Sequence, residues 1–181
     1  MDQLSNFTST SFGYVMAFLL PGLAGIYATS YYSKAVRITL EKFNGTEAGV
    51  GLFLVIAMAS LTVGLLLTAV RSAVYEKGIC RRHALKPEDF EKLGADSSHL
   101  QAFRAVADEH YRYHQFWGSM TIVLPALLVG MANRNLSHFS CSKSFFLVCS
   151  ALVLEGVTIW AAAESYKLYV RRAKAILEKK G

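Results

Sequence analysis

Four long stretches of this chain carry almost no charge, and they limit its fold more than any other feature. They are residues 12–32, 48–70, 115–133 and 144–163, and the last of them contains one charged residue, Glu155. A bilayer core is about 30 Å thick, and about 20 helical residues cross it. Lipid offers no hydrogen bonds to the backbone, so each stretch is expected to cross the membrane as a helix.

The composition agrees with a membrane protein. Of the 181 residues, 53% are hydrophobic, and the mean hydropathy is +0.31. Soluble domains usually have more charge and shorter apolar runs. The four stretches take up nearly half of the chain, which leaves no room for a separate soluble domain of ordinary size. The predicted fold class is an all-α membrane protein, in which residues 1–181 form a single domain with four transmembrane helices in a bundle.

The second, third and fourth helices are expected to extend into the cytoplasm. Nothing breaks the second helix before Gly78, and a capping box at Ser98–Gln101 begins the third helix well ahead of its apolar stretch. The fourth helix continues past its own apolar stretch. We therefore predict a helical cytoplasmic segment over residues 71–114 and a helical cytoplasmic tail over residues 164–181.

The predicted tail has an apolar stripe along one side. Its apolar residues recur at helical spacing, with most of the Lys and Arg residues opposite them. The stripe consists of Tyr166, Tyr169, Val170, Ala173, Ile176 and Leu177. Such a face is not stable in water by itself, so the sequence predicts that a cytoplasmic protein partner or the membrane surface covers it.

The basic residues indicate which side of the membrane is cytoplasmic. Residues 1–11, 71–114 and 164–181 share one side of a four-span protein and together hold fourteen of the 19 Lys and Arg residues; the loops 33–47 and 134–143 hold five. The positive-inside rule then places both termini in the cytoplasm of a multi-pass protein of the cell inner membrane. Anionic lipid explains the net charge of +6, so no nucleic-acid partner is expected.

Glu155 is the most informative polar residue. An ionised side chain near mid-membrane costs several kcal/mol unless it faces protein or water. Thr158 falls on the same helical face, and Ser60 is polar at a comparable position in its own span. We predict an intramembrane polar site formed by these three residues. Glu155 is then either part of an ion or proton path or a neutral acid bonded to a neighbouring helix.

Small residues line one face of each span. The candidate helix-packing positions are Gly64, Gly130, Ala151 and Ala162, and Ser60, Gly64 and Arg71 lie near a single stripe. Small side chains let membrane helices approach closely, and this favours association. We expect a homo-oligomer, a complex with another protein, or both.

Three histidines form a second candidate site. His110 and His114 are one turn apart, and His99 lies three turns before His110 on nearly the same face. An i, i+4 pair suits metal ligands or a pH response. Aromatic and aliphatic residues share this side, however, which favours packing. No metal and no cofactor are expected, and no catalytic residue is assigned, because nucleophile–base pairs and phosphate-binding motifs are absent.

The segment Phe18–Gly22, with the sequence FLLPG, resembles the opening of small bacterial inner-membrane proteins. Some of those are membrane subunits of phage-defence systems, and the resemblance covers five residues. We expect a non-enzymatic, oligomeric membrane subunit that is channel-like, perturbs the membrane or senses it, under control of its cytoplasmic helices. The alternatives are a scaffold, and a transporter or enzyme in which Glu155 carries protons, with a metal site at His110 and His114.

Overall fold

The computed structural model describes residues 13–44, 49–79, 97–135 and 141–178, and within these residues it is helical without strands. The all-α class is therefore confirmed for the described part of the chain. The parts of the expected cytoplasmic segments at 80–96 and 179–181 lie outside the described residues.

Three described helices are long and apolar enough to cross a membrane, and a fourth span is possible if a bent pair counts as one. The three are Val50–Tyr75, Arg112–Arg134 and Val148–Leu177. The pair is Val15–Ser30 and Lys34–Phe43, with a bend of 120° between its two helices. The structure thus supports three or four spans.

The first predicted span, 12–32, is shorter in the structure, and its described helix Val15–Ser30 counts as a span only together with Lys34–Phe43. It comprises a π-helical turn, η1 (Val15–Leu19), followed by α2 (Leu20–Ser30), in which Pro21 occupies the first turn. Proline lacks an N–H and crowds the carbonyl one turn before it, so the wider π turn lies where a regular α-turn is hardest to keep.

A short helix, α3 (Lys34–Asn44), lies in the region that the sequence analysis treats as a loop. Its charged residues Lys34, Arg37, Glu41 and Lys42 recur on one side and its apolar residues on the other. This amphipathic period of 3.6 residues indicates a helix. Counting the basic residues of each loop, which assigns the cytoplasmic side, does not detect it.

The remaining helices are long rods. The second span, α4 (Val50–Arg71), continues as the π-helical segment η2 (Ser72–Ile79). The third is preceded by α6 (Ser97–Val106) and the π-helical turn η5 (Ala107–Tyr111), and it runs as α7 (Arg112–Asn135). The last is α8 (Cys141–Glu178), an unbroken helix of 38 residues.

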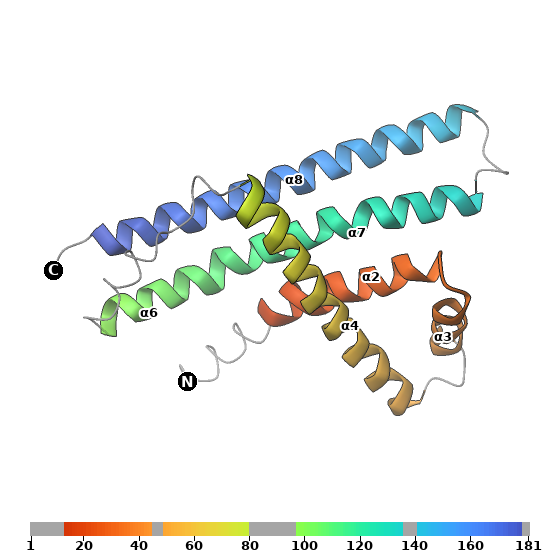
Figure 1. Ribbon diagram of the computed structural model, residues 1–181, viewed down its shortest axis with the longest axis horizontal. Helices are drawn as coiled ribbons and strands as arrows, with labels where there is room; N and C mark the ends of the chain where they lie inside the picture. Colours follow the sequence, from red (N-terminus) through yellow and green to blue (C-terminus); the bar gives the residue numbers. More distant parts are fainter. Residues whose placement is uncertain (1–12, 45–48, 80–96, 136–140, 179–181) are drawn as a thin grey trace.

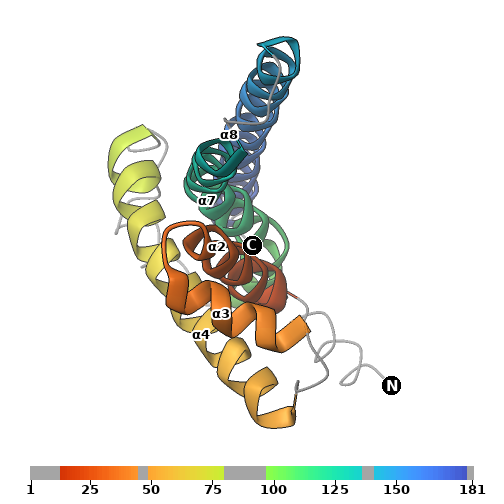
Figure 2. The same cartoon turned by 90° about the vertical axis from the view of Figure 1, so that its right-hand side faces the viewer.

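The spans do not surround one common core. The helix α2 packs on α4 and α7, while the substantial contacts of α8 are with α7, η5 and α6. Viewed end-on in Figure 2, α8, α7, α2 and α4 follow one another, with α8 and α4 on the outside. The structure is therefore more open than the four-helix bundle that the sequence predicts.

Glycines set the closest helix contact. A Cβ atom added to Gly22 would collide with the carbonyl oxygen of Ser60, and one added to Gly64 would collide with the carbonyl oxygen of Phe18. The backbone of α4 thus touches that of α2 at Gly22 and that of η1 at Phe18. Gly130 lies against Tyr31, where an added Cβ would come within 2.6 Å of the Tyr31 Cβ. Both Gly64 and Gly130 are used for packing within one subunit.

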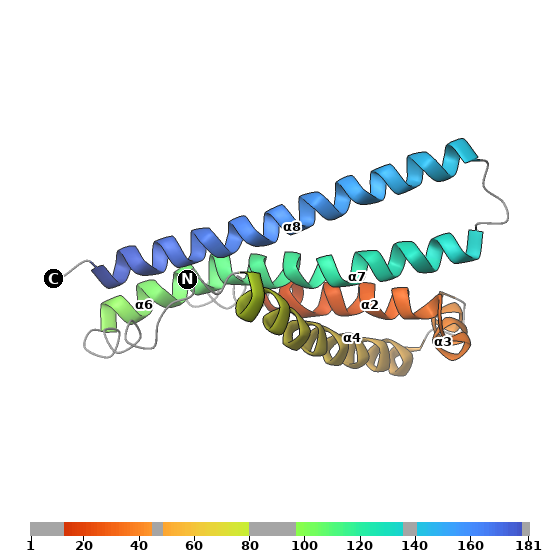
Figure 3. The ribbon, with the colours of Figure 1, turned by 45° about the horizontal axis from the view of Figure 1, so that its top comes forward.

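Among the described side chains of α8, the buried ones begin at Thr158. One residue per turn is buried from Thr158 onwards, and the buried set is Thr158, Ala162, Tyr166, Val170 and Ala173. Figures 1 and 3 show α7 and α8 lying close over this part of α8 and diverging towards the Asn135 and Cys141 ends. The apolar stripe of the tail is covered by α6 and η5 of the same chain, so it is no longer evidence for a separate partner.

Candidate functional site

Two of the three π-helical segments in the described chain meet in one buried region. Tyr75 belongs to η2 and Tyr111 belongs to η5, and their ring centroids lie 5.9 and 6.0 Å from that of His114, while η1 packs on α4 and α7. π-Helical turns are rare and occur frequently at functional sites, since the extra residue re-aims the side chains around it. Their clustering points to the region where α4 ends and α7 begins.

Arg71 lies at the centre of this region. It ends α4 and is 0% exposed. Its guanidinium carbon is 5.6 Å from the centroid of the Tyr111 ring. Gly118 makes room for its stem, because a Cβ atom there would come within 2.7 Å of the Arg71 Cδ. A desolvated cation over an aromatic face gains about 2 kcal/mol, which offsets part of the cost of burial.

His114 is also 0% exposed, and it joins three elements. Its Nδ1 is 2.8 Å from the carbonyl oxygen of Ala162 on α8. A carbonyl only accepts, so Nδ1–H donates in this bond. The imidazole is surrounded by the rings of Tyr166, Tyr75 and Tyr111, at centroid distances of 4.9, 5.9 and 6.0 Å.

A chain of hydroxyl bonds ties η2 to α7 at the same level. The Tyr75 hydroxyl donates to Thr121 Oγ1 at 2.9 Å, and the Thr121 hydroxyl donates to the Gly118 carbonyl oxygen at 2.8 Å. Tyr75 is 4% exposed, so this polar chain is shielded from water. It holds Tyr75 beside the wall on which Arg71 packs.

A second arginine lies at the edge of the region. Arg112 is 9% exposed, and its guanidinium carbon is 3.9 Å from the centroid of the Tyr14 ring. The side chain also lies against Gly13, where a Cβ atom would collide with it. The start of the chain's first helix is thereby fixed to the start of α7.

We call the set Arg71, Tyr75, Tyr111, His114 and Tyr166 the buried junction. It takes one residue from each of α4, η2, η5, α7 and α8. The arrangement brings together a buried cation, a buried imidazole and three phenols, of which that of Tyr111 is half-buried, and it links the candidate spans to the helices that continue from them.

The predicted histidine site is only partly assembled. His110 is half-buried on η5 and His114 is in the buried junction, whereas the side chain of His99 lies outside the described residues. In a regular α-helix, residues at i and i+4 lie on the same face. The π turn of η5 rotates His110 away from the face of His114. Among the described residues no group of three or more His, Cys, Asp or Glu side chains could hold a metal ion.

The predicted intramembrane site is divided between two places. Glu155 is partly buried on α8, and its Oε2 is buried without a hydrogen bond among the described residues. The Thr158 hydroxyl donates to the backbone carbonyl of Glu155 at 2.9 Å rather than to the carboxylate. Ser60 is buried on α4 beside Gly22, away from α8. Ala151 is partly buried and Ala162 fully buried along the same α8 face.

Sequence reasoning named Arg71, His114 and Tyr166 in three separate contexts, and it missed that they meet in one junction. Arg71 was visible as part of a small-residue stripe with Ser60 and Gly64, and a cation that continues a buried stripe is the signal that could have located it. Tyr75 and Arg112 gave no such signal. The chain matches no protein-family model, no curated protein and no solved structure with which it was compared.

Proposed function

We propose that the chain is a non-enzymatic, multi-pass subunit of the cell inner membrane that forms oligomers and acts on the membrane under control of its cytoplasmic helices. The action is channel-like, membrane-perturbing or membrane-sensing. The observation that carries the proposal is the buried junction, because it brings the spans and their helical extensions into one packed unit.

The buried junction supports transmission in a direct way. Protein interiors are close-packed, so a shift of one ring displaces those against it. The α6 helix and the tail of α8 pack on each other through Phe103 and Tyr169, whose ring centroids are 6.3 Å apart. Tyr169 is in turn 5.2 Å from Tyr111, and Tyr111 contacts both Arg71 and His114. A continuous set of contacts therefore leads from α6 to the end of α4.

The π turn η5 supplies an element with two states. Conversion of a π turn to an α-turn shifts the register by one residue, which rotates the preceding helix by about 100° at 3.6 residues per turn. Such a change in η5 would turn α6 relative to α7 and re-aim Tyr111. Coupling between sites needs a discrete rearrangement of this kind.

The exposed half of α8 supports the oligomer. Leu152, Val153 and Trp160 are each 68% exposed there. Lipid covers apolar side chains as well as protein does, but it does not satisfy a carboxylate. The partly buried Glu155 on this half therefore favours a second copy of the chain against α8.

Transmission is tested by hydrogen exchange on the purified protein in a bilayer. Phe103→Ala removes the ring contact with Tyr169, and we expect amides near Arg71 to exchange about tenfold faster, which corresponds to about 1.4 kcal/mol. Leu100→Ala is the control, because Leu100 is 38% exposed on the same helix. Equal exchange rates near Arg71 in both variants would contradict the proposed coupling between α6 and the end of α4.

The alternative function is a transporter or enzyme in which Glu155 carries protons, favoured by the buried Oε2 that lacks a hydrogen bond among the described residues. Glu155→Gln keeps the shape and removes the titrating group. In reconstituted vesicles, a channel-like subunit controlled at the buried junction should keep its ion flux in this variant. Loss of flux at equal abundance and assembly would favour the proton carrier.

The biological setting implied by the Phe18–Gly22 resemblance is phage defence. Pro21 and Gly22 are both buried, and Gly22 is required by the contact with Ser60, so helix packing explains this segment without that setting. Protection of cells that express the chain against phage infection is the direct test.

A further inference from the structure

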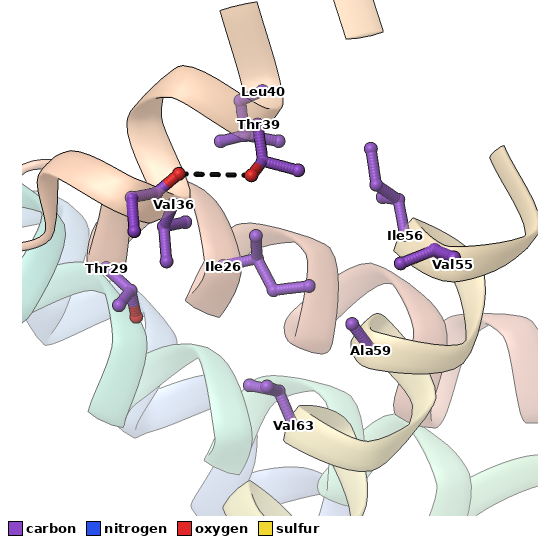
Figure 4. A pocket seen from close by; sticks show the side chains of 10 residues that line it. Ile26, Thr29, Val36, Thr39, Leu40, Val55, Ile56, Ala59 and Val63 are labelled. Carbon is purple, nitrogen blue, oxygen red and sulfur yellow. Dashed lines mark hydrogen bonds between the residues drawn. The ribbon is translucent and has the colours of Figure 1, made fainter. Parts of the chain in front are cut away.

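An apolar groove of ≈ 360 Å³ lies between α2, α3 and α4, at the opposite end of α2 from the buried junction. Figure 4 shows the side chains that line it. They are Ile26, Thr29, Ala35, Val36, Thr39, Leu40, Val55, Ile56, Ala59 and Val63.

The two hydroxyls of the groove are already used. Thr29 donates to the Gly25 carbonyl oxygen at 2.8 Å, and Thr39 donates to the Ala35 carbonyl oxygen at 3.0 Å, the bond drawn in Figure 4. The side chains that line the groove thus present methyl and methylene groups to its interior. An occupant matched to this surface is a hydrocarbon without hydrogen-bonding groups.

The position of the groove identifies the source of that hydrocarbon. The wall formed by Val55, Ile56, Ala59 and Val63 belongs to the candidate span Val50–Tyr75. A groove along a span opens to the bilayer interior, where acyl chains are the solvent. A helix of another copy of the chain is the competing occupant, and the crosslinking experiment below distinguishes it from lipid.

The two charged edges of α3 are suited to the headgroup of the same lipid. Arg37 and Lys42 flank its apolar face, and long basic side chains beside an apolar face reach headgroups in amphipathic surface helices. Arg37 Nε is 3.9 Å from Glu41 Oε1, with 38% and 66% of the two side chains exposed. An exposed pair of this kind is worth less than about 1 kcal/mol, so a phosphate can replace the carboxylate.

We propose that this groove binds one acyl chain of an anionic phospholipid, whose headgroup is held by Arg37 and Lys42. The lipid fills the angle between α2 and α3 and fixes the bend of 120° between them. The lipid site does not involve the buried junction. Its test is therefore independent of the proposed function.

Photo-crosslinking tests the acyl-chain site. The full-length protein is placed in phosphatidylcholine vesicles that contain phosphatidylglycerol with a diazirine in one chain. Crosslinks are expected on the groove-lining segments of α2, α3 and α4. Ala59→Trp fills the groove and should lower these crosslinks about tenfold, the ratio given by 1.4 kcal/mol. The control is Leu66→Trp, at a position on α4 that is 62% exposed and does not line the groove.

The headgroup is tested by the surface double variant Arg37→Gln and Lys42→Gln, which should fold normally. Its groove crosslinks should no longer favour phosphatidylglycerol over a phosphatidylcholine probe, while the equivalent double variant at Arg171 and Lys174 on the tail keeps the preference. One contrary result is that a diazirine fatty acid labels the groove as strongly as the phosphatidylglycerol probe does, in both the wild type and the Arg37 and Lys42 double variant. That result would contradict a site for the phospholipid headgroup. Labelling spread evenly over α4, or crosslinks from α3 to another copy of the chain, would overturn the site.

Discussion

From Thr158 to Ala173, α8 buries one side chain per turn, whereas from Phe146 to Trp160 most of its side chains are exposed. Both halves are regular helix. In the buried half, α6, η5 and the start of α7 supply the surroundings, and aromatic rings enclose the polar groups. In the exposed half, the apolar side chains must be covered by lipid or by another copy of the chain.

The difference shows that apolar composition alone does not locate the core of a membrane protein. The most hydrophobic part of α8 is its least buried part, while Arg71 and His114 are completely buried. Hydrocarbon is as apolar as leucine, so burial against protein is driven by packing and hydrogen bonding rather than by hydropathy. Polar side chains therefore mark where the protein itself provides the environment.

The largest effect is expected from Gly22→Leu, which breaks the contact between α2 and α4. The added side chain meets the Ser60 backbone, which is unable to rotate away. Overpacking of this kind costs about 3 kcal/mol or more, equivalent to a fall in Tm of about 6–12 °C in a chain of this size. Thermal unfolding in detergent measures it. An unchanged Tm would mean that α2 and α4 do not touch in this way.

His114→Ala should have the next largest effect. It leaves a cavity among three tyrosines and removes the bond to Ala162, with an expected loss of about 2–4 kcal/mol in the free energy of unfolding. Tyr113→Ala is the matched control, because Tyr113 is adjacent and 48% exposed, and it should change stability by less than about 0.5 kcal/mol. Similar losses in the two variants would contradict the contrast between buried and exposed positions.

Tyr75→Phe sharpens the comparison at the level of a single hydroxyl. The ring stays against His114, and only the bond to Thr121 is lost, so about 1 kcal/mol, or 2–4 °C in Tm, is expected. Tyr32→Phe is a suitable control. Its hydroxyl donates to the Ala126 carbonyl oxygen at 2.7 Å from an exposed position, and that carbonyl belongs to the interior of α7, where it also accepts the helical N–H bond. The prediction fails if Tyr32→Phe costs as much as Tyr75→Phe.

Gly156→Leu should have almost no effect on the stability of the monomer. An added Cβ atom finds no atom within 4 Å, since Gly156 lies on the open half of α8. If a second copy covers this half, the variant should instead lower the oligomeric mass measured by light scattering in mild detergent. A normal mass together with a normal Tm would assign the exposed half of α8 to lipid and remove the α8 contact from the proposed oligomer.

The sequence was sufficient to predict the helical class and the approximate positions of the apolar helices, because each span satisfies its own backbone hydrogen bonds. It was insufficient for the site. Arg71 and His114 are far apart in the chain, and the three tyrosine rings around His114 come from three further elements, η2, η5 and α8. The predicted group of Glu155, Thr158 and Ser60 relied on comparable depth in the membrane, which does not specify the neighbours of a helix.

What the sequence determined by itself is local. Hydropathy and helical period follow from neighbouring residues, and they located the apolar helices and the amphipathic face of the tail; the same period is present in α3, although the charge count treated that region as a loop. Tertiary structure alone decided that the tail packs on α6, that η2 and η5 meet around Arg71, and that buried side chains begin at Thr158 in the described part of α8. The physical reason is that membrane helices associate through shape and a few polar contacts, and these depend on which surfaces meet in space.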